Sequence, residues 1–204
     1  MDTSTGKGSQ LMLIYVIRHG ESEDDLSDSY GGAANFPLTD HGRQQAKTTA
    51  SSLKDANISA IYASPLARAR ESAEILAAEL GGLTVETMND LRERNTYGVL
   101  SGHTRTRAQE LFGYLIDPLP YKPGEWPYCM PGGEEYEPFI NRVRSAFENV
   151  VSKATRDGHQ TVAIVTHGKF TLGLFTGVLS LGEKYQKDHG SVNVIEHHPA
   201  RLVH

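Results

Sequence analysis

The sequence predicts a three-layer α/β/α sandwich with a mainly parallel sheet and a short cap insertion. Strand-like and helix-like segments alternate along most of the chain, which is typical of a parallel sheet covered by helices on both faces. Several strand-like segments are continuous apolar runs, as expected of strands buried on both faces. One long irregular stretch, rich in Pro, Gly and aromatic residues, interrupts the alternation, and such insertions often form a lid over a site.

The first half of the chain predicts alternating strands and helices. The apolar run from Leu11 to Ile17 indicates a buried strand, and a helix is expected from Thr39, its N-cap, to Leu53. A second apolar strand extends from Ile58 to Ala63, and the helix that follows, from about Leu66 to Leu80, ends at two glycines. The alternating segment from Leu83 to Met88 predicts a third strand.

The second half of the chain contains the predicted cap. The irregular stretch from about Arg94 to Gly133 is expected to form it, with a short helix from about Arg105 to Leu111. The segment from Glu134 to Ala154 has apolar residues at helical spacing, which indicates a long amphipathic helix. Another buried strand is expected from Thr161 to Thr166, followed by a helix from about Lys169 to Leu179. Two short terminal strands are expected: Ser191–Glu196 and Ala200–Val203.

The composition favours a soluble globular protein. The chain has 204 residues, of which 38% are hydrophobic and 22% charged, so we expect one domain over residues 11–204 with a core of ordinary size. Residues 1–10 are polar and rich in Gly, Ser and Thr, and are expected to form a flexible tail. The net charge of −5 argues against a broad nucleic-acid-binding surface.

Targeting signals and cysteines restrict the location and the chemistry further. The start of the chain lacks the apolar segment of a signal peptide, and no apolar run approaches the length of a membrane span. We therefore expect a cytoplasmic protein without membrane contact. Cys129 is the only cysteine, which excludes an intrachain disulfide and a four-cysteine metal site. The sequence does not indicate an oligomeric state.

Basic residues and histidines follow the ends of the predicted strands. Arg18 and His19 come directly after the first strand, and His167 follows a later one. Arg68 lies in the first turn of the helix after the second strand. Because ligands bind beyond the carboxyl ends of parallel strands, we expect these side chains to lie close together. Each of them alone also fits a structural role, such as a surface arginine or a core histidine, and only their combination indicates a site.

These residue types suit the transfer of a phosphoryl group. A neutral, oriented imidazole such as that of His19 can attack phosphorus, and the guanidiniums of Arg18 and Arg68 match phosphate oxygens in geometry and charge. Gly20 would let the backbone approach the anion closely. Glu93 is a candidate acid for the leaving oxygen, because burial beside the negative phosphate would keep it protonated.

At these positions the chain resembles the histidine phosphatase superfamily, also called the phosphoglycerate-mutase-like family. The resemblance extends from about Leu13 to Glu196, nearly the whole predicted domain. The motifs that carry it are Arg18-His19-Gly20-Glu21-Ser22, Pro37-Leu38-Thr39 with Gly42, Ser64-Pro65-Leu66-Ala67-Arg68-Ala69, Glu93, Pro131-Gly132-Gly133-Glu134, Thr166-His167-Gly168 and Ser191-Val192-Asn193-Val194-Ile195-Glu196.

The resemblance implies a role for each catalytic candidate. His19 would be the nucleophile that becomes a phosphohistidine, with His167 as its companion in the phosphate pocket. Arg18 and Arg68 would clamp the phosphoryl oxygens, and Glu93 would be the proton donor. The family needs no metal or other cofactor, and the positive charge could come from the two arginines and the two histidines.

The segment after the first motif departs from the family pattern. The family commonly has an asparagine that contacts phosphate where this chain has Asp25, and residues 23–28 are acidic. A carboxylate there would repel phosphate unless it is protonated, paired or turned away. Gly31 and Gly32 match the family's tight turn beside the phosphate. We therefore take Ser22, Asp25 and Gly31 as further candidate substrate-binding residues.

The sequence and the resemblance together favour a phosphatase. The segment between Glu93 and Pro131 is short compared with that expected of glycolytic mutases, and a shorter cap should admit water more readily. The expected activity is hydrolysis of a small phosphorylated metabolite, a phosphomonoester, through a phosphohistidine on His19. Three alternatives stay open: a phosphoglycerate mutase, a protein phosphohistidine phosphatase, and a phospho-ligand-binding module without turnover.

Overall fold

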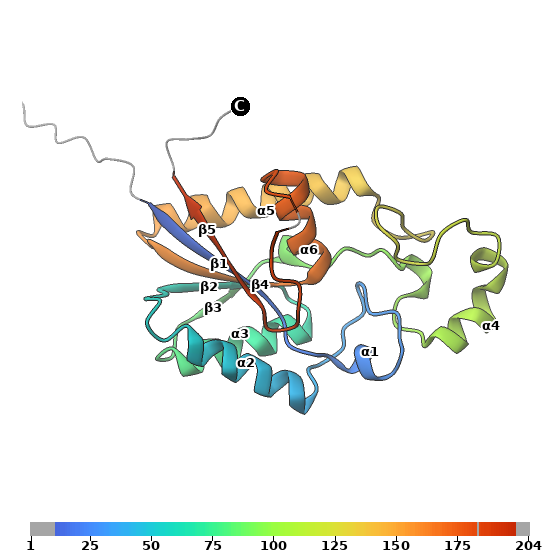
Figure 1. The fold of residues 1–204 in the computed structure, drawn as a ribbon, viewed down its shortest axis with the longest axis horizontal. Coiled ribbons are helices and arrows are strands. Elements are labelled where there is room, and N and C mark those ends of the chain that lie inside the picture. The colour runs from blue at the N-terminus through green and yellow to red at the C-terminus, as the bar shows by residue number, and fades with distance from the viewer. Residues whose placement is uncertain (1–10, 183, 199–204) are drawn as a thin grey trace, which may run out of the picture.

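The computed structural model describes residues 11–182 and 184–198, and within them a mixed sheet lies between two layers of helices (Figure 1). The strands are β1 (Met12–Arg18), β2 (Ala60–Ala63), β3 (Val85–Thr87), β4 (Thr161–Thr166) and β5 (Val192–His197). Their order in the sheet is β3-β2-β4-β1-β5. The pairs β3–β2, β2–β4 and β4–β1 are parallel, whereas β5 is antiparallel to β1. The predicted mainly parallel sheet of a three-layer sandwich is confirmed.

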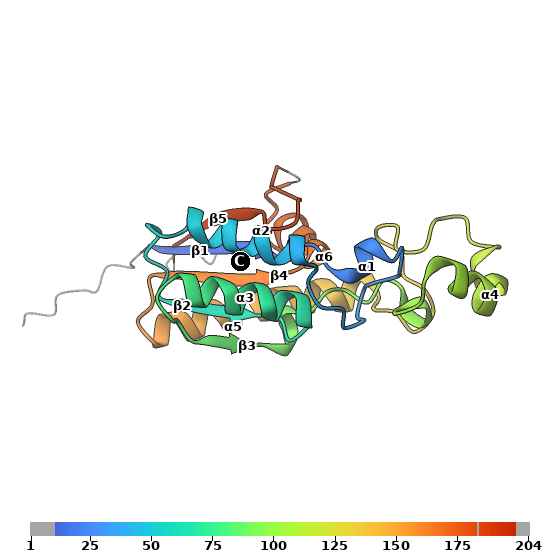
Figure 2. The same ribbon diagram turned by 90° about the horizontal axis from the view of Figure 1, so that it is seen from below.

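Helices cover both faces of this sheet (Figure 2). The helices are α1 (Glu23–Leu26), α2 (Asp40–Ser52), α3 (Ala67–Glu79), α4 (Arg105–Ile116), α5 (Tyr136–Arg156) and α6 (Gly168–Leu172). Shorter turns are the 3-10 segments Asn89–Leu91 and Gly98–Leu100 and the π-helical turn Gly173–Val178, which continues α6. Helices α2 and α3 lie on one face of the sheet, and α5 and α6 lie on the other (Figures 1 and 2).

Two apolar cores hold these layers together. On one face, Phe139 and Val143 of α5 pack with Ile14 of β1 and Ile164 of β4, and all four side chains are fully buried. On the other face, small residues of α2 and α3, such as Ala50 and Ala73, pack against the apolar side chains of the central strands. Burial of each large apolar side chain stabilises the fold by about 1.5–3 kcal/mol, so the central strands are held firmly on both sides.

The register of the two central strands sets the position of the candidate site. Arg18 of β1 pairs with Thr166 of β4, so the next residue of each strand, His19 and His167, reaches the same edge of the sheet. The chain leaves both strands at this carboxyl edge, as the parallel arrangement predicts. Two histidines that lie far apart in the sequence are therefore brought together by strand pairing alone.

The segment between the 3-10 turns and α5 projects beyond this edge as a cap (Figure 1). Its small apolar cluster combines Leu100, Ala108 and Met130 with Tyr30 from the segment after α1. Helix α4 is longer than the predicted segment Arg105–Leu111. Phe112 adopts a non-helical conformation (φ −130°, ψ 16°) at a kink, and the helix continues beyond it to Ile116.

Some predicted elements differ in the structure. The last strand is antiparallel, and α1 was not predicted because four residues show no periodicity. The helix predicted from Lys169 to Leu179 is the short α6 followed by the wider π-helical turn. The tail of residues 1–10 and the strand Ala200–Val203 lie outside the described residues. Within the described part of the chain, every helix is too short or too polar to cross a bilayer.

Gly20 has a packing role that the sequence did not indicate. A Cβ at Gly20 would overlap the carbonyl group of Gly42 at the start of α2, and a Cβ at Gly42 would overlap that of Glu21. The backbone N–H of Gly20 donates to the Ser72 hydroxyl of α3 at 3.1 Å. Gly20 therefore allows close contact between the loop after β1 and α2, and its approach to an anion stays a prediction.

The Gly20→Ala variant tests this contact. We expect its free energy of unfolding to fall by about 1–3 kcal/mol, because the methyl group meets backbone that cannot move aside. This change corresponds to a loss of about 2–4 °C in Tm per kcal/mol for a chain of this size. Thermal unfolding measures it, with Gly113→Ala in α4 as control, where the closest neighbour of an added Cβ is the flexible Gln109 side chain. Equal Tm values for the two variants would contradict the assignment.

Candidate active site

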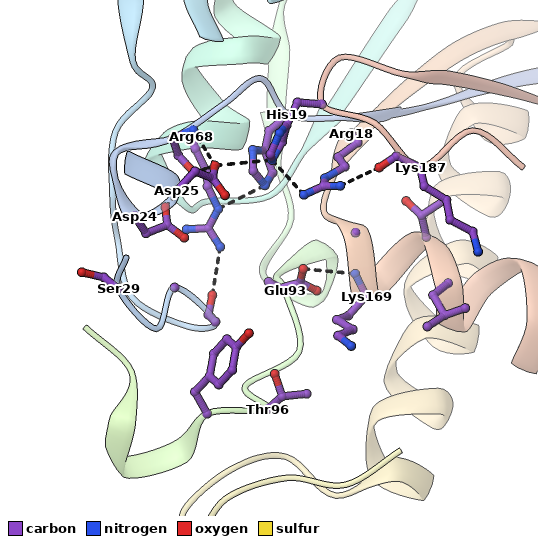
Figure 3. A pocket seen from close by; sticks show the side chains of 18 of the residues that line it. Arg18, His19, Asp24, Asp25, Ser29, Arg68, Glu93, Thr96, Lys169 and Lys187 are labelled. Carbon is purple, nitrogen blue, oxygen red and sulfur yellow. Dashed lines mark hydrogen bonds and ion pairs between the residues drawn. The ribbon is translucent and has the colours of Figure 1, made fainter. Parts of the chain in front are cut away.

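A cavity of about 570 Å³ opens at the carboxyl edge of the sheet, between the sandwich and the cap (Figure 3). Four of the five predicted catalytic residues line it: Arg18, His19, Arg68 and Glu93. The predicted binding residues Ser22, Asp25 and Gly31 also line it. The fifth catalytic candidate, His167, is fully buried next to His19, and the centroids of the two rings are 5.0 Å apart.

The two ring nitrogens of His19 have different partners. Nδ1 lies 2.6 Å from the carbonyl oxygen of Gly20, and Nε2 lies 3.2 Å from Nε of Arg68. A carbonyl oxygen can only accept a hydrogen bond and a guanidinium can only donate one. The proton of the neutral ring is therefore on Nδ1, and Nε2 carries a lone pair that faces the cavity wall formed by Arg68.

The surroundings of His19 also keep its ring uncharged. Burial, and then the charge of Arg68, place the pKa of His19 well below the ordinary value of 6.5. Both causes disfavour the imidazolium form, which would be desolvated and close to a cation. His19 is therefore neutral at neutral pH, as a histidine nucleophile must be.

Arg68 is held by the turn that follows α1. Its Nη1 donates to the carbonyl oxygen of Ala34 at 2.8 Å and its Nη2 to that of Gly32 at 2.9 Å. Gly32 has a positive φ of 51°, and so the tight turn predicted here is what presents these carbonyl groups. The side chain of Arg68 is almost completely buried, and two hydrogen bonds aim its remaining Nε donor at His19.

Arg68→Lys removes this geometry while keeping a positive charge. A lysine cannot bond both turn carbonyls and His19 from one planar group. We expect kcat for a phosphate ester to fall about 100- to 1000-fold, the usual loss on removing one oriented donor. The matched control is Arg70→Lys on the same helix, where the side chain is 52% exposed and pairs with Glu74. Steady-state kinetics measure both, and activity of Arg68→Lys near that of the control would contradict the role.

Arg18 lies on the opposite side of His19 and is anchored by the loop that precedes β5. One of its terminal nitrogens donates to the carbonyl oxygen of Lys187, and the other lies 2.8 Å from Nε2 of His189. Its Nε is buried and has no hydrogen-bond partner among the described residues. A buried donor without a partner is costly, so this N–H is suited to a ligand oxygen.

His167 is tied to the end of β2. Its Nε2 lies 2.7 Å from the Ser64 hydroxyl, and its Nδ1 is buried with no partner among the described residues. Burial, followed by the charge of Arg68, lowers the pKa of His167 well below 6.5. Nδ1 becomes a donor when Nε2 accepts the hydroxyl proton of Ser64. Ser64, which we predicted only as part of a motif, can therefore orient this ring.

Glu93 follows the turn after β3 and reaches the start of α6. One of its oxygens accepts from the backbone N–H of Arg94 at 2.8 Å and of Phe170 at 3.2 Å, and the other from that of Lys169 at 3.1 Å. These bonds hold the carboxyl group at the mouth of the cavity, below His19 in the view of Figure 3. The protonation expected from the sequence stays a prediction.

The three further binding candidates mainly hold one another. The Ser22 hydroxyl donates to Asp24 at 2.7 Å, and the Ser22 N–H donates to Asp25 at 3.0 Å. A Cβ at Gly31 would overlap the Asp24 carboxylate. Asp25 also lies 3.4 Å from Nε2 of His189. Of the three ways in which Asp25 could avoid repelling phosphate, the structure favours pairing, with the Ser22 N–H as its partner while His189 is neutral.

Two residues of the cavity were missed by the sequence reasoning. Lys169 directly follows the Thr-His-Gly motif; its Nζ donates to the Gly124 carbonyl of the cap at 3.1 Å and lies 5.8 Å from the Trp126 ring. Burial lowers the pKa of Lys169, and Glu93 opposes this shift. His189 precedes β5, and the sequence gives no signal that this strand is antiparallel and so brings His189 to the site.

No cluster of three or more His, Cys, Asp or Glu able to hold a metal ion occurs among residues 11–182 and 184–198. The positive charge around the cavity comes from Arg18, Arg68, Arg105, Lys169 and Lys187. That no metal is needed stays a prediction of the resemblance. The described groups can surround a tetrahedral dianion with hydrogen-bond donors, and the neutral imidazole of His19 can present its lone pair to that dianion.

Comparison with known proteins gives related sequences along almost the whole chain. A family model for the histidine phosphatase superfamily (branch 1) matches residues 14–203. The chain is 34% identical over 187 residues to phosphoglycerate mutase-like protein 4 of Arabidopsis thaliana, covering 89% of this chain and 77% of that protein. It is 28% identical over 185 residues to a 2,3-bisphosphoglycerate-dependent phosphoglycerate mutase of Parvibaculum lavamentivorans, covering 89% and 85%.

Solved structures have the same fold. A phosphoglycerate mutase from Bacillus anthracis aligns with a TM-score of 0.78 and 25% identity, over 93% of this chain and 89% of that one. An α-ribazole phosphatase from Shigella flexneri aligns with a TM-score of 0.73 over 90% of each chain, and its 23% identity shows a common fold only. Mutases and phosphatases thus both occur among the similar proteins. Since the family model spans nearly the whole chain, this protein belongs to the histidine phosphatase superfamily.

Proposed function

We propose that this protein is a phosphatase that hydrolyses a small phosphorylated metabolite, a phosphomonoester, through a phosphohistidine on His19. The observation that carries the proposal is the state of the His19 ring. Its Nδ1 proton is directed to the Gly20 carbonyl, its Nε2 lone pair lies at the cavity, and its pKa is lowered well below 6.5. A neutral imidazole of fixed tautomer is what in-line attack on phosphorus requires.

The first half of the reaction transfers the phosphoryl group to the protein. The phosphate displaces the Arg68 Nε–H from Nε2 of His19, and this nitrogen forms a bond to phosphorus as the bond to the ester oxygen breaks. Glu93 gives its proton to the departing oxygen, so that the leaving group departs as a neutral alcohol. Arg18, Arg68 and the Nδ1–H of His167 stabilise the equatorial oxygens.

The second half releases phosphate. Glu93, now ionised, accepts a proton from a water molecule while the water oxygen bonds to phosphorus and the nitrogen–phosphorus bond breaks. His19 returns to its neutral form and inorganic phosphate leaves. The wide cavity of about 570 Å³ between sandwich and cap supports this step, because it leaves room for water beside the phosphohistidine.

A phosphoglycerate mutase is the second candidate, because the similar proteins include chains with that name. Both activities pass through a phosphohistidine, and they differ in whether water or a second hydroxyl group takes the phosphoryl group. The short cap, in which α4 is the only α-helix between β3 and α5, favours water in this chain.

A substrate screen separates the two activities. Purified protein is incubated with sugar phosphates, phosphoglycerates, nucleotides and a phosphohistidine peptide, and both inorganic phosphate and isomerised phosphoglycerate are measured. Release of phosphate from a small ester at many times the rate of isomerisation is the expected result. Isomerisation of phosphoglycerate without phosphate release would favour the mutase, and neither product from any compound would reject both candidates.

A further inference from the structure

We infer that His189 is a positioning residue for Arg18, and that Asp25 is its alternative partner when the imidazole gains a proton. This inference rests on the proposed function only in taking the cavity as a phosphate site. His189 belongs to none of the motifs by which the sequence resembles its family. It lines the cavity, and its ring centroid lies 5.4 Å from that of His19.

The contact with Arg18 determines the tautomer of His189. Nη2 of Arg18 lies 2.8 Å from Nε2 of His189, and since a guanidinium can only donate, Nε2 accepts and carries no proton. The same loop supplies the Lys187 carbonyl to the other terminal nitrogen of Arg18. Two acceptors from one loop thus hold the guanidinium in one plane.

Protonation removes one of these two acceptors. An imidazolium Nε2–H cannot accept from Arg18 and would place two donors against each other. The Asp25 carboxylate lies 3.4 Å from this same nitrogen and can accept a hydrogen bond from it once the nitrogen is protonated. The imidazolium therefore pairs with Asp25 and cancels the negative charge of that carboxylate, which by itself would favour phosphate. We expect the weakened hold on Arg18 to outweigh this change. Arg18 meanwhile keeps only the Lys187 carbonyl.

The charged groups around His189 favour the neutral ring. Burial lowers the pKa of His189 below 6.5, the charge of Arg18 lowers it further, and Asp25, Glu21 and Asp24 oppose these shifts. The neutral, Arg18-holding form is therefore the state near neutral pH. As the pH falls through this lowered pKa, the protonated form of His189 appears, and the hydrogen bond that Arg18 donates to its Nε2 is lost.

Binding of inorganic phosphate tests the inference directly and without turnover. Isothermal titration calorimetry on the intact protein compares wild type with His189→Ala and His189→Gln from about pH 8 to about pH 5, the range in which a histidine changes charge. At pH 8 we expect His189→Ala to bind phosphate about 10-fold more weakly, the loss of one hydrogen bond to a charged group. The amide oxygen of Gln can replace the acceptor, so His189→Gln is expected to bind within about 3-fold of wild type.

The pH series distinguishes positioning from simple packing. Because Gln cannot be protonated, the affinity of His189→Gln relative to wild type should be constant at high pH and rise as the pH falls. The control is His198→Gln, an exposed position at the far end of β5, for which this ratio should stay at one. The added phosphate titrates equally in every assay and cancels from the ratio.

Several results would overturn the inference. One is full phosphate affinity in His189→Ala at pH 8, and another is a ratio for His189→Gln that does not change with pH. Tighter binding by wild type than by His189→Gln at low pH would show that the imidazolium acts as an added cation. Wild-type protein that does not bind phosphate at all would also overturn it. Binding without phosphate release from any ester would instead count against the proposed function alone.

Discussion

His19→Ala should abolish turnover, with a fall in kcat on the order of 10⁶-fold, the size of loss seen when an enzyme loses its covalent nucleophile. No other imidazole of the described cavity can replace it. His167 is fully buried with its Nε2 bonded to the Ser64 hydroxyl, and Nε2 of His189 is occupied by Arg18. The variant should also fail to form the acid-labile, alkali-stable label that a phosphohistidine gives in the wild type.

Rapid-quench labelling with a radioactive phosphate ester measures the intermediate, and phosphate release measures the rate. His41→Ala is the control, because His41 is exposed on α2 and outside the cavity. This control should label and turn over as the wild type does. A stable label in His19→Ala, or phosphate release close to the wild-type rate, would place the nucleophile elsewhere.

Glu93→Gln should lower kcat by about 10²- to 10⁴-fold for an alkyl phosphate, the usual contribution of a general acid. The loss should shrink greatly for p-nitrophenyl phosphate, because its leaving group departs as a stable anion without a proton. An amide nitrogen at this position faces a backbone N–H of Arg94, Phe170 or Lys169, whichever way the amide turns. Glu93→Ala therefore serves as a second variant without that repulsion.

The comparison of two substrates makes this prediction specific. Both Glu93 variants should show the same dependence on the leaving group, measured as the ratio of kcat values for the alkyl and the aryl ester. Glu148→Gln, exposed on α5, should leave the ratio unchanged. An equal loss on both esters in both variants would show that Glu93 shapes the cavity and does not donate the leaving-group proton.

Features encoded by adjacent residues were predicted well from the sequence. The apolar runs at β1, β2 and β4 show directly which strands are buried on both faces, and the N-cap of α2 is a local signal at Thr39, whose hydroxyl accepts from the Gly42 N–H at 2.9 Å. The gathering of Arg18, His19, Arg68 and His167 also followed from the sequence, because parallel strands end at a common edge.

Features that depend on a neighbouring segment were not predictable in this way. The sequence suggests that Gly20 is a loop glycine beside an anion. Only the packed structure shows that the backbone of Gly42 lies against it. His189 precedes the last strand, so in a wholly parallel sheet it would lie at the edge away from the site. It reaches the site because β5 is antiparallel to β1, and the sequence carries no signal for that direction.

The sequence by itself determined the layered fold and the set of groups that can carry phosphoryl transfer, because hydrophobic periodicity and short motifs act over a few residues. The tertiary structure alone decided how these groups are oriented. It places the Gly20 carbonyl and Arg68 on opposite nitrogens of His19, which selects the tautomer, and it sets His189 between Arg18 and Asp25. Such choices depend on distances and directions between segments far apart in the chain, and hydrogen bonds and burial act only once packing has brought those segments together.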